Sequence, residues 1–300
     1  MLYQPRNKTI GEKASLMDGR TRWLGIIGYP IRHSLSPLMH NAAFEALDMN
    51  YCYIALAVEP RRMRSAVNAL QSLGFRGFNV TIPHKQRIMA FMDRLTSEAK
   101  LIGAVNTVEI QRDRLIGHNT DGRGFTGALR EETGCSVTGQ RVLLLGGGGA
   151  ARAVAFQLIL EGVRTLLIAN RSSQRAQGLA RNIRRLSNRC AISVLPWDEG
   201  ALKKCAQESD IIINATSVGM NPFDPPLLSS TILRPHHVVC DLIYKPPVTA
   251  LLKQAKKAGA TAVSGLGMLV HQGALSFEIW TGRRPPLDIM REAIRQALMP

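Results

Sequence analysis

The sequence predicts an α/β fold in two parts, and three observations support this prediction. Short apolar runs typical of strands alternate with helical patterns along most of the 300 residues. This alternation is typical of mainly parallel sheets covered by helices. The length suggests about two domains. The pattern of apolar and polar residues differs before and after Gly122, and the second region contains a run of glycines at 146–149.

In the first part, apolar runs predict strands at 24–28, 51–58, 77–81, 104–111 and 115–119. Helical spacing predicts helices at 37–47, 61–73, 87–94 and 96–101. Ser36 is a candidate N-cap, because Pro37 suits the first position of a helix. The last two strands would pair around the turn residues Arg112 and Asp113.

In the second part, the same patterns predict strands at 141–145, 164–169, 192–195, 211–214, 238–242 and 261–263. Helices are predicted at 125–133, 150–161, 173–186, 268–280 and 287–298. The run 141–145 is almost wholly apolar, as expected of a strand buried within a parallel sheet. The segment Gly265-Leu266-Gly267 is predicted to be a hinge before the last two helices.

Composition narrows the class of protein. No stretch approaches the ~18 uninterrupted apolar residues of a membrane span, and residues 1–22 lack the apolar core of a signal peptide, so they are predicted to be a flexible extension. The five cysteines are scattered without a C-x-x-C pair. This pattern predicts a cytoplasmic protein with neither a disulfide framework nor a bound metal.

The net charge of +16 is compatible with several kinds of negatively charged partner. Arginines far outnumber acidic residues between 123 and 190, and such a field attracts nucleic acid, a membrane surface or a phosphorylated small molecule. A solvated basic helix face explains the same charge. Aromatic residues make up only 5% and no nucleic-acid motif is present. We therefore expect a small-molecule ligand rather than nucleic acid or membrane.

The glycine run has the spacing of a dinucleotide-binding loop. Gly146, Gly148 and Ala151 match G-x-G-x-x-A between a predicted strand and a predicted helix. The first glycine permits the tight turn, the second allows the backbone to approach a pyrophosphate, and the third small residue allows close packing. The phosphates would face the N-terminus of the helix. An ordinary glycine-rich loop is the alternative.

The residues after the next strand indicate which dinucleotide binds. NAD enzymes usually place Asp or Glu there to bind the ribose 2′-hydroxyl. This chain has no carboxylate in 170–175 and instead has Asn170, Arg171, Ser172 and Arg175. A guanidinium binds a 2′-phosphate well. The sequence thus favours NADP, with NAD as the alternative if both arginines are simply exposed at a helix start.

Three polar segments of the first part are candidates for a substrate site. Ser34 and Ser36 precede a helix and offer hydroxyls and N–H groups to a carboxylate, unless Ser36 only caps that helix. Lys85 follows the polar run 79–84 at a strand end, where α/β sheets bind ligands, although it could also be a surface lysine. Asn106 and Asp121 are expected to come close across the predicted strand pair, although turn chemistry explains both.

Together these segments resemble shikimate dehydrogenases and the related quinate/shikimate dehydrogenases. The resemblance runs from about Leu24 to Leu298, so it covers nearly the whole chain. The motifs that carry it, in order, are His33-Ser34-Leu35-Ser36-Pro37, the run 79–85, Ala104–Asn106, Asn119–Gly122, the glycine loop, Asn170-Arg171 and the run 265–272.

The resemblance implies an N-terminal α/β substrate domain and a Rossmann-type dinucleotide-binding domain with C-terminal helices that return to the first. We place these at 23–122, completed by 273–300, and at 123–272. It also implies roles for individual residues. The catalytic pair would be Lys85 and Asp121. The substrate carboxylate would be held by Ser34 and Ser36 near Tyr244, and its hydroxyls would lie near Thr81, Lys85, Asn106, Asp121 and Gln272. The cofactor would contact Gly146, Gly147, Gly148, Gly149, Ala150, Asn170, Arg171, Ser172, Arg175, Leu242 and Gly265.

The expected activity is reversible NADPH-dependent reduction of 3-dehydroshikimate to shikimate by a monomer or homodimer. Oxidation of a secondary alcohol requires a group that accepts the hydroxyl proton, and Lys85 beside a carboxylate suits that task. A quinate/shikimate dehydrogenase using NAD or NADP is the alternative, since 29–33 and 219–222 are similar to that branch. Ser264 departs from the family, which often has Asp there.

Overall fold

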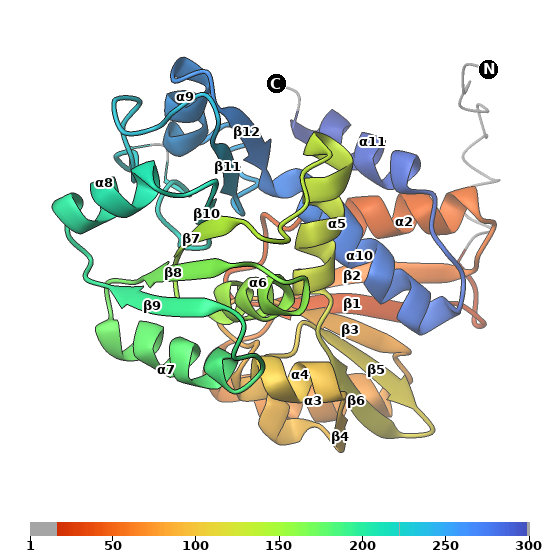
Figure 1. The fold of residues 1–300 in the computed structure, drawn as a ribbon. Helices are drawn as coiled ribbons and strands as arrows, with labels where there is room; N and C mark the ends of the chain where they lie inside the picture. Colours follow the sequence, from red (N-terminus) through yellow and green to blue (C-terminus); the bar gives the residue numbers. More distant parts are fainter. Residues whose placement is uncertain (1–16, 222, 299–300) are drawn as a thin grey trace.

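The computed structural model describes residues 17–221 and 223–298, which form two six-stranded sheets flanked by helices (Figure 1). The first sheet is built from strands that precede residue 119, and the second from strands that follow residue 140. The predicted α/β fold is confirmed. Residues 1–16, most of the predicted N-terminal extension, lie outside the described residues, whereas Arg22 already belongs to the first strand.

The first sheet has the order β2-β1-β3-β5-β6-β4. Its strands are β1 (Arg22–Gly28), β2 (Tyr51–Ala57), β3 (Gly77–Val80), β4 (Arg94–Leu95), β5 (Thr107–Gln111) and β6 (Arg114–His118). β1 is parallel to both β2 and β3, but β5 is antiparallel to β3 and β6. Arg112 and Asp113 both adopt positive φ in the two-residue turn, which confirms the predicted strand pair and makes this part of the sheet antiparallel.

The helices of this half are η2 (Pro60–Arg62), η3 (Arg87–Phe91), α2 (Ser36–Ala46), α3 (Met63–Ser72), α4 (Ser97–Ile102) and α5 (Asp121–Thr133). Two predictions here are wrong. Ser36 is the first residue of α2 rather than its N-cap, because the Ser34 hydroxyl already accepts from the Ser36 N–H at 3.3 Å. The predicted helix at 87–94 is a short 3-10 turn, because the chain then joins the sheet edge as β4 beside β6.

The second sheet is fully parallel, with the order β12-β11-β10-β7-β8-β9. Its strands are β7 (Arg141–Leu145), β8 (Thr165–Ala169), β9 (Ala191–Leu195), β10 (Ile211–Asn214), β11 (Val238–Asp241) and β12 (Thr261–Ser264). The strand order reverses between β7 and β10. In open α/β sheets, ligands bind at the carboxyl ends of the strands at this reversal.

The remaining helices are α6 (Gly149–Leu160), α7 (Ser173–Arg184), α8 (Glu199–Gln207), α9 (Ala250–Lys257), α10 (Gly265–Thr281) and α11 (Leu287–Leu298). The predictions missed α8 and α9, although Asp198 and Thr249 cap their N-termini through side-chain oxygens. The predicted hinge at 265–267 is wrong, because these residues form the first turn of α10. The Gly265 N–H donates to the Ile243 carbonyl, which ties the start of α10 to the second sheet.

The last two helices return to the first sheet (Figure 1). Phe277 of α10 and Met290 and Ile294 of α11 are buried in one apolar cluster with Phe44 of α2 and Leu24 of β1. This packing holds α10 against both halves of the molecule, since its first turn starts beside β11 and its later turns cover the first sheet. Residues far apart in the sequence can therefore meet where α10 passes the strand ends.

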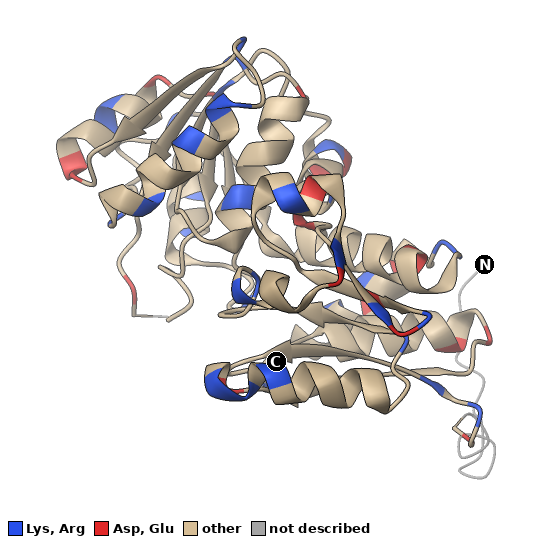
Figure 2. Ribbon diagram, turned by 90° about the horizontal axis from the view of Figure 1, so that it is seen from below, with Lys and Arg blue, Asp and Glu red and all other residues tan. Residues whose placement is uncertain are grey.

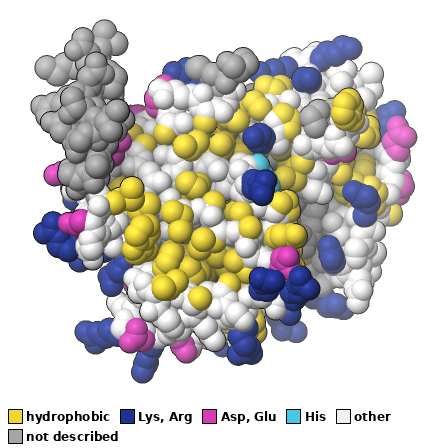
Figure 3. Space-filling view, turned by 180° about the vertical axis from the view of Figure 1, so that it is seen from behind, with side chains coloured by type: hydrophobic (Ala, Val, Ile, Leu, Met, Phe, Trp, Pro, Cys, Tyr) yellow, Lys and Arg dark blue, Asp and Glu magenta, His cyan; other side chains and the backbone are white. Residues whose placement is uncertain are grey.

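Lysine and arginine residues are spread over both halves of the chain rather than gathered in one stripe (Figure 2). Hydrophobic side chains gather on the face opposite the view of Figure 1 (Figure 3). An apolar groove between β2 and α3 is lined by residues that include Trp23, Ile54, Leu73 and Phe75. None of the described helices combines the length and the apolar character needed to cross a membrane.

Candidate active site

A lysine and an aspartate form a buried ion pair at the carboxyl ends of the first sheet. Lys85 lies just beyond β3 and Asp121 is the first residue of α5, directly after β6. Lys85 Nζ lies 2.6 Å from Asp121 Oδ2, and the two side chains are 16% and 4% exposed. The predicted pairing of these two residues is confirmed. A buried ion pair needs further hydrogen bonds to offset its desolvation.

Asn106 supplies one of these further bonds. Its Nδ2 donates to Asp121 Oδ1 at 2.9 Å, so both oxygens of the carboxylate are engaged. The amide is itself oriented, because its Oδ1 accepts from the Thr120 backbone N–H at 2.8 Å. Asn106 is 2% exposed and Asp121 is 3% exposed. The predicted approach of Asn106 to Asp121 is confirmed, and the pair is held in one geometry.

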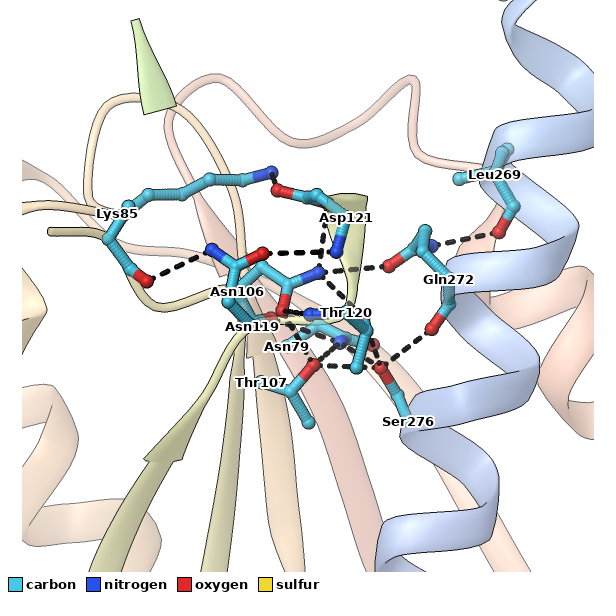
Figure 4. A network of polar contacts seen from close by, with 11 residues as sticks. Asn79, Lys85, Asn106, Thr107, Asn119, Thr120, Asp121, Leu269, Gln272 and Ser276 are labelled. Atoms are coloured by element: carbon cyan, nitrogen blue, oxygen red, sulfur yellow. Dashed lines mark hydrogen bonds and ion pairs between the residues drawn. The ribbon is translucent and has the colours of Figure 1, made fainter. Parts of the chain in front are cut away.

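A wider network of polar side chains supports this arrangement (Figure 4). Asn79, Thr107, Thr120 and Ser276 join it, and each is at most 4% exposed. Sequence reasoning included Asn79, Thr107 and Thr120 in polar segments without giving them a role, and it missed Ser276. Ser276 had a usable signal, because it interrupts an otherwise apolar face of a helix at a buried position. Buried polar groups are almost always hydrogen-bonded, so such a serine indicates a partner across the core.

Gln272 reaches the same network from α10. Its Oε1 accepts from Asn106 Nδ2 at 3.3 Å, and its Nε2 donates to the Leu269 carbonyl at 2.8 Å. The two serines predicted to bind a carboxylate, Ser34 and Ser36, lie at the start of α2. Ser36 is 3% exposed. The Tyr53 hydroxyl donates to Asn79 Oδ1 at 2.7 Å. Burial raises the pKa of Tyr53 well above its usual value, which keeps this hydroxyl protonated as a donor.

Two predicted substrate residues, Thr81 and Tyr244, form no side-chain hydrogen bond to this network among the described residues. Thr81 is half-buried beside Gly28, at the ends of β3 and β1. Tyr244 follows β11 and packs against the apolar cluster that contains Ile31 and Leu35, on either side of Ser34. Burial raises the pKa of the Tyr244 hydroxyl. Tyr244 thus extends from the second half of the molecule toward the serine segment of the first.

The glycine loop follows β7 at the point where the strand order reverses. Gly146 has φ +126°, and a methyl group there would lie 2.7 Å from the Ala215 carbonyl oxygen, so only glycine fits. Gly148 occupies the N-cap position of α6 with no side-chain cap bond. The first N–H groups of α6 are therefore open to an anion, and the helix dipole favours negative charge there. Gly147 and Ala150 complete this loop.

The predicted specificity residues lie beside this loop. A methyl group at Gly147 would lie 3.4 Å from Asn170 Cγ and 3.3 Å from Arg175 Cβ. Arg171 and Arg175 are exposed, and no acidic residue lies in 170–175. Ser172 is used locally, since its hydroxyl accepts from the Arg175 N–H at 3.4 Å and caps α7. The loop and the two guanidinium groups fit a dinucleotide that carries an additional phosphate.

The other predicted cofactor residues, Leu242 and Gly265, lie side by side at the ends of β11 and β12. A side chain at Gly265 would collide with the Leu242 backbone carbonyl, so glycine is required there. Ser264, the departure from the family pattern, is the last residue of β12 and sits at the N-cap of α10 without a side-chain cap bond. Within the described ranges, no group of three or more His, Cys, Asp or Glu side chains could hold a metal ion.

The two ends of the site meet at Gly149 and Lys85. A methyl group at Gly149, the first residue of α6, would lie 3.2 Å from Lys85 Cβ and 3.3 Å from its Cδ. The apolar stem of the lysine therefore packs directly against the glycine loop. A buried Lys–Asp pair in contact with a dinucleotide-type loop defines the class of protein: an α/β enzyme that combines a nucleotide-type loop with a buried ion pair.

Comparison with known families makes the assignment specific. The model described as shikimate dehydrogenase substrate binding domain matches residues 26–108. The models described as shikimate/quinate 5-dehydrogenase and shikimate 5′-dehydrogenase C-terminal domain match residues 128–230 and 265–295. The chain belongs to the shikimate dehydrogenase family.

Individual relatives cover nearly the whole chain. It is 48% identical to the shikimate dehydrogenase (NADP(+)) of Methanopyrus kandleri, over 94% of this chain and 98% of the relative. It is 45% identical to the enzyme of the same name from Desulforamulus reducens, over 93% and 97%.

Solved structures agree with this assignment. A crystal structure of shikimate dehydrogenase in complex with NADP+ superposes with a TM-score of 0.88 at 43% identity, covering 95% of this chain and 98% of that one. The quinate dehydrogenase of Corynebacterium glutamicum in complex with NAD superposes at 0.84 and 31% identity, covering 92% and 99%. The fold is thus shared by both branches of the family, while the identity is higher to the NADP-bound shikimate enzyme.

Proposed function

We propose that this chain is an NADP-dependent shikimate dehydrogenase that reversibly reduces 3-dehydroshikimate to shikimate in aromatic amino acid biosynthesis. The observation that carries the proposal is the Lys85–Asp121 pair, held by Asn106 and in contact with the glycine loop. Family membership and the NADP-dependent relatives support the same activity.

The pocket would bind the substrate through groups on both of its sides. Ser34 and Ser36 would hold the carboxylate through hydroxyls and N–H groups near the start of α2, with Tyr244 beside them. Thr81, Asn106 and Gln272 would line the part of the pocket that faces the substrate hydroxyls. The amides of Asn106 and Gln272 are already oriented by protein partners, so little ordering is required when substrate binds.

Lys85 would move the proton. In the oxidation direction the substrate hydroxyl loses its proton to Lys85 Nζ, and in the reduction direction Nζ returns it. The Asp121 carboxylate, 2.6 Å from Nζ, would orient the amine and stabilise its charged form. Asn106 would keep Asp121 in place by donating to the other carboxylate oxygen. Each role requires the short distances that the buried network imposes.

The cofactor would be held by the glycine loop and the residues after β8. Its nicotinamide would exchange the hydride with the substrate carbon. Gly146 to Ala150 would bind the pyrophosphate at the start of α6, Asn170, Arg171, Ser172 and Arg175 would bind the 2′-phosphate end, and Leu242 and Gly265 would lie near the nicotinamide half. The lack of a carboxylate in 170–175 supports NADP over NAD.

We further propose the division of labour between domains. Residues 23–122, completed by 273–300, would bind the substrate, and residues 123–272 would bind the cofactor. The five unpaired cysteines favour a reducing, cytoplasmic setting. The enzyme would act on its small-molecule substrate as a monomer or homodimer.

A four-way assay tests the proposal. Purified protein is given shikimate or quinate, each with NADP+ or NAD+, and kcat/KM is measured for all four pairs. The proposal expects the highest value for shikimate with NADP+. Substantial turnover of quinate with NAD+ would favour the quinate/shikimate dehydrogenase instead, and no turnover of any pair would overturn the activity itself.

A further inference from the structure

A ring of four hydrogen bonds lies beneath the catalytic pair (Figure 4). Its members are Asn106, Thr107, Thr120 and Ser276. The contacts are Thr120 Oγ1 to Ser276 Oγ at 3.3 Å, Ser276 Oγ to Thr107 Oγ1 at 2.8 Å, Thr107 Oγ1 to Asn106 Oδ1 at 3.0 Å, and Asn106 Nδ2 to Thr120 Oγ1 at 2.8 Å. All four residues are at most 4% exposed, so water competes little with these bonds.

Donor counts limit the directions that these contacts can take. Asn106 Nδ2 can only donate, so Thr120 Oγ1 accepts from it and the Thr120 hydrogen is available to Ser276. Thr107 Oγ1 donates to Asn106 Oδ1, so Ser276 is the donor where it contacts Thr107. The Ser276 hydrogen has a second acceptor, the Gln272 carbonyl at 3.0 Å. Asn79 Nδ2 lies 3.0 Å from Ser276 Oγ, from Thr107 Oγ1 and from the Asn106 carbonyl, and its two hydrogens serve two of these three acceptors.

The ring defines which way the Asn106 amide faces. With Oδ1 receiving hydrogen bonds from Thr107 and from the Thr120 backbone, the Nδ2 hydrogens face Thr120 Oγ1 at 2.8 Å and Asp121 Oδ1 at 2.9 Å, and Gln272 Oε1 is a third, longer contact at 3.3 Å. A flipped amide would place its carbonyl oxygen against the carboxylate and its NH2 group against two donors. The bonds that Asn106 Oδ1 accepts from Thr107 and Thr120 therefore determine whether Asp121 receives a hydrogen bond on the side away from Lys85.

Ser276 is the member that comes from elsewhere in the chain. Asn106, Thr107 and Thr120 lie at the facing ends of β5 and β6, whereas Ser276 is on α10, beyond the entire second sheet. Its hydroxyl also lies 3.0 Å from the Gln272 carbonyl one turn earlier. Ser276 thus connects α10, and with it Gln272, to the strand ends that carry the catalytic pair.

We propose that Ser276 is a positioning residue for the reaction: it closes the hydrogen-bonded ring that orients the Asn106 amide toward Asp121. The expected effect of Ser276 on kcat rests on the proposed function, whereas its effect on the orientation of the Asn106 amide does not. Ser276 touches no reacting group and acts through Asn106 and Asp121.

The test compares Ser276→Ala with Ser276→Thr and with a matched control. Thr281→Ala removes a hydroxyl from the same helix that bonds to the carbonyl four residues earlier, at 2.7 Å, as Ser276 does, but it lies outside the ring. We expect Ser276→Ala to lower kcat for shikimate oxidation about ten-fold, with KM for shikimate changed less than about three-fold. Ser276→Thr, which keeps the hydroxyl, should regain most of kcat, and Thr281→Ala should keep wild-type kinetics.

A double-mutant cycle and a structure make the test decisive. Thr107→Val interrupts the same ring at the next member, so its effect and that of Ser276→Ala should be strongly non-additive. The crystal structure of Ser276→Ala should show Asn106 Nδ2 withdrawn from Asp121 Oδ1. Additive effects, or an unchanged Asn106–Asp121 contact together with wild-type kcat, would overturn the proposal. A wild-type protein that does not oxidise shikimate would count against the proposed function, and the position of Asn106 in the variant structure would still decide the role of Ser276.

Discussion

The two ends of the site are built in opposite ways. At the proposed substrate end, the polar side chains are almost fully buried, and each is held by protein partners, as Asn106 and Asp121 illustrate. At the proposed cofactor end, the glycine loop presents its backbone, and the charged residues Arg171 and Arg175 are exposed. The comparison indicates that the proposed acid–base group is preorganised, whereas the proposed phosphate site depends on open N–H groups and on charged side chains that become ordered when the ligand binds.

The largest expected effect comes from removing the preorganised acid–base group. Lys85→Ala should lower kcat by about 10²–10⁴-fold with little change in KM, because proton transfer is lost while the pocket keeps its other groups. Steady-state kinetics with shikimate and NADP+ measure this. Lys253→Ala, which removes an exposed lysine from α9, is the control. A large rise in KM with kcat intact would make Lys85 a binding residue and would break the comparison.

Substitutions at the proposed cofactor end should change KM for NADP+ rather than kcat. Replacing both Arg171 and Arg175 by Ala should raise KM for NADP+ by about 10–100-fold, because charge-assisted bonds to a phosphate are lost, and should leave kcat and KM for NAD+ nearly unchanged. Arg181→Ala removes a charge from the far end of the same helix and serves as the control. A parallel loss with NAD+ would mean that these arginines serve the shared part of the dinucleotides.

Burial at the substrate end should also make stability depend on pH. His40 is fully buried among aromatic rings, 4.3 Å from the centroid of Tyr53, and neither ring nitrogen has a hydrogen-bond partner among the described residues. Desolvation lowers its pKa to about 3. Because the folded-state pKa lies below the unfolded value, the unfolded state binds more protons between these values, and stability falls as pH drops from about 6.5 toward 3.

His40→Phe removes this titration. The loss of unfolding free energy between pH 7 and pH 4.5 should shrink by about 2–3 kcal/mol relative to wild type, as measured by urea unfolding at each pH. Each protein is characterised by the change in its unfolding free energy between the two pH values. Any packing cost of the larger ring is the same at both pH values and therefore cancels. His33→Phe, at a partly exposed histidine of the same segment, is the control. An unchanged pH dependence in His40→Phe would show that other groups dominate acid unfolding.

We expect the smallest effect from a substitution at Gly149, where the glycine loop contacts the Lys85 side chain. Gly149→Ala would place a methyl group 3.2 Å from Lys85 Cβ and displace the lysine stem. We expect kcat to fall about ten-fold, with a smaller change in KM for NADP+, because misplacement of a catalytic group weakens the transition state more than binding. Gly178→Ala, at a helical glycine with open space around it, is the control. A rise in KM for NADP+ at constant kcat would assign Gly149 to phosphate binding alone.

Local sequence signals identified most of the site. The glycine spacing, the missing carboxylate after β8 and the polar strand ends all rest on residues within a few positions of one another, where the chain itself fixes the geometry. The Lys85–Asp121 pair was implied by the resemblance to the family rather than by a local pattern, since β5 lies between β3 and β6, the strands that precede the two residues. The same local signals failed at Ser36, which begins α2 instead of capping it, and at 87–94, where the chain joins the sheet edge instead of continuing as a helix.

By itself, the sequence determined the α/β class, the family and the candidate residues for charge and phosphate chemistry, because alternation and motif spacing are properties of short segments. Only the tertiary structure decided how α10 returns across the strand ends, that Ser276 closes a ring with Thr107 and Thr120, and that Gly149 touches Lys85. These contacts join residues separated by tens to hundreds of positions, and their geometry is set by how whole helices and sheets pack, which no local pattern encodes.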